Sequence, residues 1–177
     1  MQFKESQKDM ITAYYGGATG VLSSGIIWCI AGFVGIAFSN VASMAALFIG
    51  GSFIVPLSVL ISKGLKRTGK HSNNNVLRHL AIEGLGILFV GLFLAYAMSQ
   101  FNINLFYPVM LLVIGTRYLT FQTLYGLKLY WILGGTLILV GFALFFLSHT
   151  FIIGAFLGGV IEILFSLLIF KKSKVDI

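Results

Sequence analysis

The strongest constraint on this chain is a series of six apolar runs, each long enough to cross a lipid bilayer as a helix. A helix rises about 1.5 Å per residue and needs about 20 residues to cross the hydrocarbon layer. The runs are continuous rather than alternating, which excludes a transmembrane β-barrel, because barrel strands alternate in hydrophobicity. We therefore predict six membrane-spanning helices, at residues 18–38, 41–62, 80–99, 103–123, 130–148 and 150–170.

The composition and the links between the runs support one all-α transmembrane domain over residues 1–177. Only 10% of the residues are charged and 58% are hydrophobic, whereas soluble proteins carry about 25% charged residues. Very short links at Asn40, Asn102 and His149 require antiparallel neighbours, so the six spans form a polytopic bundle of three helical hairpins. Pro56 lies inside the second span and is expected to kink that helix.

The basic residues indicate the orientation of the chain. Eleven of its 12 Lys and Arg residues lie in the two tails, in the loop 63–79 or at Lys128, which a six-span chain places on one side of the membrane. Basic residues accumulate on the cytoplasmic side, so we expect both termini in the cytoplasm and the chain in a bacterial-type cell membrane. The net charge of +7 follows from this topology, and we expect the lipid bilayer, not nucleic acid, as a partner.

Small residues recur at intervals of four near the start of the first span and within the sixth. Gly16, Gly20 and Ser24 form the first series, and Gly154 and Gly158 belong to the second. Because lipid provides no hydrophobic drive between helices, close packing in a membrane relies on such small side chains. We expect these residues to pack helices within the bundle. A homo-oligomer, or another membrane protein bound to the same faces, is the alternative.

Three ionisable residues lie inside predicted spans, namely Glu83, Arg117 and Glu162. A charge at the centre of a span costs about 2.5–3.5 kcal/mol, so such residues usually face the bundle interior and form pairs. All three fall in the cytoplasmic half of their spans, and Thr116 and Thr120 lie near Arg117 on its helix. We predict an intramembrane polar cluster that binds a solute or relays a proton or ion. A structural ion pair is the alternative, and Glu83 can also reach the membrane interface.

Motifs of the major enzyme classes are missing from the sequence: no metal-ligand spacing, phosphate-binding loop or hydrolase motif occurs. We therefore expect neither a metal nor a cofactor, and no enzymatic activity. Intramembrane charges favour a small transporter or permeation protein for an ion or small solute, which requires a polar, water-accessible cavity. The second candidate is a structural or accessory membrane subunit, which requires a dry bundle with paired charges. The third is a membrane enzyme.

Residues 114–126, with the sequence IGTRYLTFQTLYG, resemble a segment of an uncharacterised family of small multi-pass bacterial membrane proteins. The number of spans, the chain length and the Phe-Ile-Val-Pro turn at residues 53–56 are similar as well, so the resemblance covers most of the chain. The family has no assigned activity. The resemblance implies only that the stretch around Arg117 is characteristic of the protein.

Overall fold

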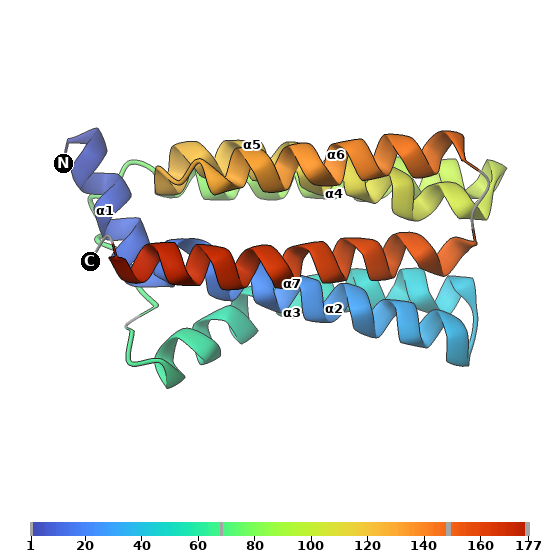
Figure 1. Ribbon diagram of the computed structural model, residues 1–177, viewed down its shortest axis with the longest axis horizontal. Coiled ribbons are helices and arrows are strands. Elements are labelled where there is room, and N and C mark those ends of the chain that lie inside the picture. The colour runs from blue at the N-terminus through green and yellow to red at the C-terminus, as the bar shows by residue number, and fades with distance from the viewer. Residues whose placement is uncertain (1, 68, 148–149, 176–177) are drawn as a thin grey trace.

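The computed structural model describes residues 2–67, 69–147 and 150–175 and contains no β-strand in these ranges. Long helices run side by side in one bundle, with a shorter helix at one end (Figure 1). The helices are α1 (Phe3–Tyr14), α2 (Ala18–Ala37), α3 (Asn40–Gly64), α4 (Arg78–Phe101), α5 (Phe106–Tyr125), α6 (Leu129–Phe146) and α7 (Phe151–Val175), with 3₁₀ turns at Tyr15–Gly17 and Ile103–Leu105. Six helical segments are long and apolar enough to cross a membrane, which confirms the predicted all-α transmembrane fold.

Helices α2 to α7 follow the six predicted spans in order. The largest difference is in the sixth, because α7 continues to Val175 rather than ending at residue 170. Lys171 and Lys172 extend this helix past the apolar run, where water replaces lipid and a helix needs no apolar surface. The predicted end of the fifth span at Ser148 and the link at His149 lie outside the described residues.

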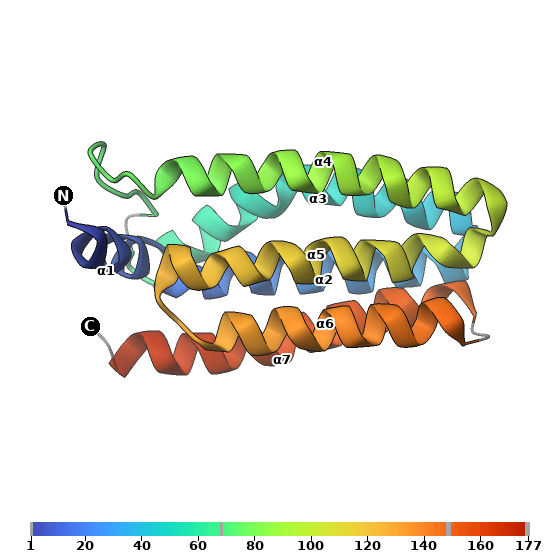
Figure 2. The ribbon, with the colours of Figure 1, turned by 90° about the horizontal axis from the view of Figure 1, so that it is seen from above.

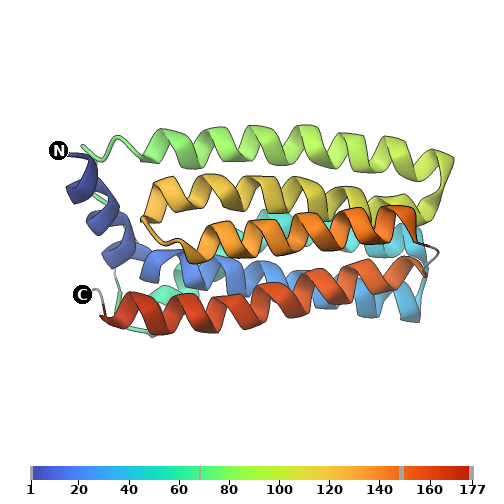
Figure 3. The same cartoon turned by 45° about the horizontal axis from the view of Figure 1, so that its top comes forward.

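Helix α1 is an addition to the predicted architecture, which left the N-terminal residues as a tail. It lies across one end of the bundle (Figure 3), and its polar sequence is too short to form a span of its own. Its residues Ser6, Met10 and Ala13 are buried. The Gln7 side-chain amide donates a hydrogen bond to the Thr123 carbonyl oxygen of α5 at 2.8 Å. These contacts bind α1 to the end of the bundle.

The turn between α1 and α2 is formed by Tyr15, Gly16 and Gly17, whose φ angles are 51°, 60° and 83°. Glycine adopts such left-handed angles without the steric cost of a Cβ atom. Gly16, which we predicted as a helix-packing residue, lies in this turn, where a Cβ atom would meet the Ser173 side chain of α7. The Tyr130 hydroxyl of α6 donates to the Gly16 carbonyl oxygen at 2.6 Å and fixes the turn against the bundle.

Both termini and the loop between α3 and α4 lie at the same end of the bundle, which we call the basic end (Figures 1 and 2). The tails and this loop carry most of the Lys and Arg residues. The loop is bound to α1, because the Asn75 side-chain amide donates to the Ser6 carbonyl oxygen at 2.9 Å and to Oδ2 of Asp9 at 2.8 Å. The positive-inside pattern predicts that the basic end faces the cytoplasm.

This orientation can be measured with single cysteines. Cys29→Ser leaves a chain without cysteine, and Asn40→Cys, Asn74→Cys or Asn102→Cys is then added. We expect a membrane-impermeant thiol reagent to label residues 40 and 102 in intact cells, and residue 74 only after the cells are permeabilised. Labelling of residue 74 from outside, with residues 40 and 102 protected, would reverse the orientation.

Helix α3 diverges from the bundle. It bends away in the half that leads to the loop (Figure 1), and Pro56 lies inside this helix. Proline removes one helix hydrogen bond and displaces the preceding turn, which is a common cause of such a bend. Helix α3 packs mainly against α2, and α4 packs mainly against α5. Helices α3 and α4 therefore have little direct contact with each other.

Glycines bring α2 and α7 close together. A Cβ atom built on Gly25 would lie 2.8 Å from the Gly159 carbonyl oxygen, and one built on Gly159 would lie 2.5 Å from Sγ of Cys29. Two of the predicted packing residues also lie in α7, where Gly154 faces Tyr107 and Gly158 faces the ring of Trp28. The sixth-span series is therefore used for contacts within the chain.

Adding one methyl group at this contact is expected to destabilise the protein. Gly159→Ala must displace Cys29 or the facing backbone of α2, and overpacking of this kind costs about 1–3 kcal/mol. Gly135→Ala in α6 is the matched control, because nothing lies within 4 Å of a Cβ atom at that position. We expect thermal unfolding in detergent at a lower temperature for Gly159→Ala than for Gly135→Ala. Equal unfolding temperatures would contradict the tight contact.

Candidate functional site

A cavity of about 250 Å³ lies in the half of the bundle next to the basic end. Its walls come from α1, α2, the bent half of α3, the first turns of α4 and the last turns of α5. Gly20 and Ser24, which the sequence assigned to helix packing, line this cavity. The lining contains the basic residues Arg117 and His71 and, among the described residues, no Asp or Glu. Arg117 therefore gives the cavity wall a positive charge, and the buried carboxyl group of Glu162 lies nearby.

Arg117 reaches the cavity from α5, and the buried Glu162 carboxyl group of α7 lies close enough to interact with its charge. Its Nε atom is buried and has no hydrogen-bond partner in the described part of the chain. The side chain passes Gly84 of α4, where a Cβ atom would lie 3.4 Å from Nε. The guanidinium carbon lies 5.2 Å from the centre of the Phe121 ring, which provides a cation–π contact. Arg117 thus lies between an aromatic ring and a glycine, and its Nε–H group makes no hydrogen bond within the described residues.

Glu162 of α7 is fully buried, with 0% of its surface exposed. The Tyr118 hydroxyl donates to Oε1 at 2.8 Å, whereas Oε2 has no hydrogen-bond partner among the described residues. Ser24 also lies beside this carboxyl group. Tyr118 and Ser24 line the cavity, so Glu162 lies directly behind the cavity wall. Buried polar atoms without partners are rare and need an explanation, and an ionisable group inside a membrane is a candidate functional residue.

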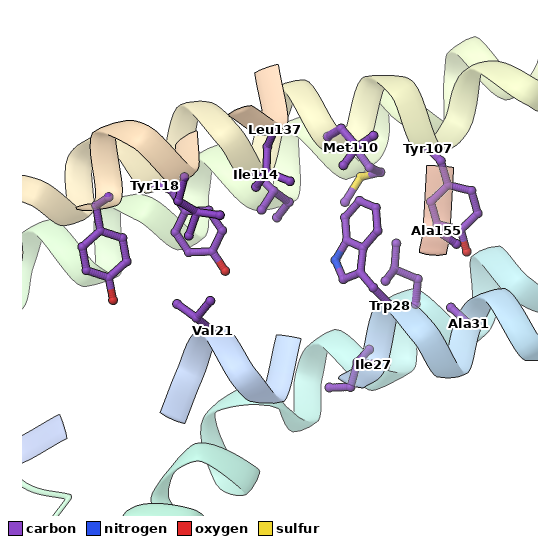
Figure 4. Close-up of a cluster of buried hydrophobic side chains, with 14 of the residues drawn as sticks. Val21, Ile27, Trp28, Ala31, Tyr107, Met110, Ile114, Tyr118, Leu137 and Ala155 are labelled. Atoms are coloured by element: carbon purple, nitrogen blue, oxygen red, sulfur yellow. The ribbon is translucent and has the colours of Figure 1, made fainter. Parts of the chain in front are cut away.

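The bundle interior is filled on the side of the cavity away from the basic end. Figure 4 shows Tyr118 reaching from α5 toward Val21 of α2, with Ile114, Met110 and Trp28 farther along. Trp28 is 2% exposed and Met110 is 3% exposed. These apolar side chains separate the cavity from the opposite end of the bundle.

At the basic end, α1 and the α3–α4 loop both border the cavity and are joined by a hydrogen bond. The Tyr14 hydroxyl and Nδ1 of His71 are 2.8 Å apart, and both residues line the cavity. The two residues are 57 positions apart in the sequence, and no sequence pattern indicated the contact. Helix α1 and the loop therefore form one cover for the cavity.

The structure places the residues that we predicted as one polar cluster at three positions. Arg117 lines the cavity and Glu162 lies behind its wall, but Glu83 is exposed on α4. Nε of Arg117 and Oε2 of Glu162 have no hydrogen-bond partner within the described residues, although the two groups lie close enough to interact through their charges. The Thr116 and Thr120 hydroxyls donate to backbone carbonyls of their own helix. Successive residues differ by about 100° around a helix, so depth alone did not determine which side chains meet.

The helices and their hydrophobicity define a multi-pass membrane protein. The chain belongs to the DUF7010 family, a family of unknown function, whose profile matches residues 3–172. This agrees with the resemblance to an uncharacterised family that the sequence indicated. Comparisons with curated proteins and with solved structures gave no match.

Proposed function

We propose that this protein is a non-enzymatic transporter or permeation protein that moves a small anionic solute across the membrane, with the solute bound at Arg117. The observation that carries the proposal is a cavity of about 250 Å³ that contains a cation with an unpartnered nitrogen. Leaving a buried guanidinium N–H group without a partner is costly unless an anion or water occupies the adjacent space. A solute that pairs with Arg117 removes this cost.

The separation of the cavity from the far end of the bundle supports a transport cycle. Trp28 and Met110 fill the interior beyond the cavity, while the cover at the basic end consists of a short helix and a loop. A transporter needs two conformations that expose its site to opposite sides. In this proposal the solute enters one of the two conformations from the basic end, because the cavity lies in that half of the bundle.

Glu162 is the second functional residue in this proposal. It contacts the solute cavity indirectly, through the Tyr118 hydroxyl and beside Ser24. A carboxyl group at this position can release a proton, or take one up, through the Tyr118 and Ser24 hydroxyls that lie between it and the cavity, as the solute binds. We propose that this proton exchange couples solute binding to the change of conformation.

A scaffold protein is the competing function, and it requires a dry interior with paired charges. Three observations favour transport, namely the cavity itself and, among the described residues, the lack of a hydrogen-bond partner for Nε of Arg117 and for Oε2 of Glu162.

Purified protein reconstituted in liposomes tests the proposal. The probes are radiolabelled phosphate, sulfate, methanesulfonate and octanesulfonate, with choline as a cationic control. We expect saturable uptake of at least one anion above the level of protein-free liposomes, and no uptake of choline. Uptake of every anion at the protein-free level would contradict a transport function and leave the scaffold function as the better explanation.

A further inference from the structure

The cavity has a lateral opening between α3 and α4. Val55 of α3 and Ile82 and Leu85 of α4 line the cavity, yet they are 61%, 63% and 39% exposed. Each lies in a helix that is long and apolar enough to span the membrane. Side chains that belong to both a cavity wall and the outer surface mark the edge of an opening. In a membrane this opening faces the lipid chains rather than water.

The cavity lining combines apolar walls with one basic side chain. Ile54 and Val55 on one side and Ile82 and Leu85 on the other form apolar walls. Arg117 lines the same cavity and lies roughly 12 Å along α5 from the end of that helix at Tyr125. At that depth an anion drawn from the membrane surface must leave water, and pairing with Arg117 compensates for that loss.

The size of the cavity limits its occupant. Sites for small molecules usually enclose about 300–1,000 Å³, and this cavity is slightly smaller, at about 250 Å³. We expect a cavity of this size to accommodate an anionic head with part of one hydrocarbon chain, and the rest of such a chain to extend through the lateral opening into the bilayer.

We propose that the cavity binds an anionic lipid with a single hydrocarbon chain, which reaches Arg117 sideways through the opening between α3 and α4. The anionic head pairs with the Arg117 guanidinium, and the chain lies against Val55, Ile82 and Leu85. This inference names the substrate class of the proposed transporter and therefore rests on the proposed function. Carboxylate and phosphate heads share the required chemistry.

Photo-crosslinking in nanodiscs of phosphatidylcholine tests the position of the chain. The probe is lysophosphatidylglycerol with a diazirine in its acyl chain, and the crosslinked residues are mapped by mass spectrometry. We expect the crosslinks to concentrate at Val55, Ile82 and Leu85. Leu139 and Phe142, which are exposed on α6, report ordinary contact with bulk lipid. If Val55, Ile82 and Leu85 are crosslinked no more often than these two residues, the proposal is overturned.

Competition tests the chemistry of the head. We expect laurate and dodecyl phosphate, which have both an anionic head and a chain, to reduce crosslinking. We expect no reduction by lysophosphatidylcholine, which has no net charge, or by inorganic phosphate, which has no chain. If lysophosphatidylcholine competes as well as dodecyl phosphate, the site does not require an anionic head. Competition by inorganic phosphate alone would replace the lipid with a water-soluble anion. Either result overturns the proposal.

Two pairs of variants test the residues. Arg117→Gln is expected to reduce crosslinking by at least about tenfold, because charge-assisted hydrogen bonds are among the strongest polar contacts. Arg78→Gln, which lies outside the cavity, is the control and is expected to leave crosslinking unchanged. Ile82→Trp is expected to obstruct the opening, while Ile132→Trp, at a 57% exposed position near the start of α6, is not. The second pair keeps the proposal testable if Arg117→Gln does not fold. If Arg117→Gln and Ile82→Trp are both crosslinked as strongly as the wild type, the proposal is overturned.

Failure of this inference can be distinguished from failure of the proposed function. Specific crosslinking without uptake of any probe anion would support the lipid site and contradict transport. Uptake of a water-soluble anion without specific crosslinking would support transport and overturn the lipid site.

Discussion

Replacing Arg117 with glutamine is expected to reduce anion uptake by reconstituted protein by at least about tenfold. Glutamine retains hydrogen-bonding groups but loses the positive charge. The described lining of the cavity contains no acidic residue that the change would leave without a partner. Glutamine also fits beside Gly84, because it is shorter than arginine. We therefore expect normal membrane insertion and a normal elution position in size-exclusion chromatography.

Two control variants separate charge from general disturbance at this site. Arg117→Lys keeps the charge and is expected to retain part of the uptake, because an ammonium group cannot reproduce the planar contacts of a guanidinium. Arg78→Gln removes a positive charge at the start of α4, where the side chain donates to the Asn73 carbonyl oxygen, and is expected to leave uptake unchanged. Equal uptake by wild type and Arg117→Gln would show that the solute does not bind at Arg117.

Replacing Glu162 with glutamine is expected to lower uptake to the level of protein-free liposomes while the fold is retained. The amide has nearly the same shape, and its oxygen still accepts the hydrogen bond from Tyr118. It cannot exchange a proton, so the coupling step fails. Uptake is measured together with thermal unfolding in detergent. Unchanged uptake in Glu162→Gln would reject the proton exchange, and a loss of stability with unchanged uptake would assign Glu162 a structural role.

Glu162→Ala provides the structural comparison. It leaves the buried Tyr118 hydroxyl without its acceptor, and an unsatisfied buried group costs about 1–3 kcal/mol. We expect Glu162→Ala to unfold at a lower temperature than Glu162→Gln. A Glu162→Ala protein with normal stability and normal uptake would exclude the residue from both roles.

The sequence predicted the six long helices well because lipid allows few alternatives. A backbone in hydrocarbon must satisfy its own hydrogen bonds, so an apolar run of about 20 residues becomes a helix whatever its neighbours are. Helix α1 has no such constraint. Its position depends on distant partners, such as the Thr123 carbonyl oxygen and the Asn75 side chain, which local hydrophobicity does not report.

The candidate site was only partly predictable for a related reason. Hydrophobicity identified Arg117 and Glu162 as unusual and placed them at similar depths, but it did not give the rotation of each helix about its axis. That rotation brings Tyr118, rather than Arg117, into direct contact with Glu162 and leaves Glu83 exposed. Tyr118 was missed because an aromatic residue in an apolar run has no distinguishing pattern in the sequence.

The contacts between α1 and the α3–α4 loop also have a mechanical consequence. Tyr14 binds His71, and Asp9 binds Asn75, so hydrogen bonds join the N-terminal helix to the loop. The loop in turn continues into α3 and α4, the two helices at the sides of the lateral opening. The N-terminal helix is therefore connected, through the loop, to both sides of that opening, and we expect variants that break these hydrogen bonds to change the width of the gap between α3 and α4.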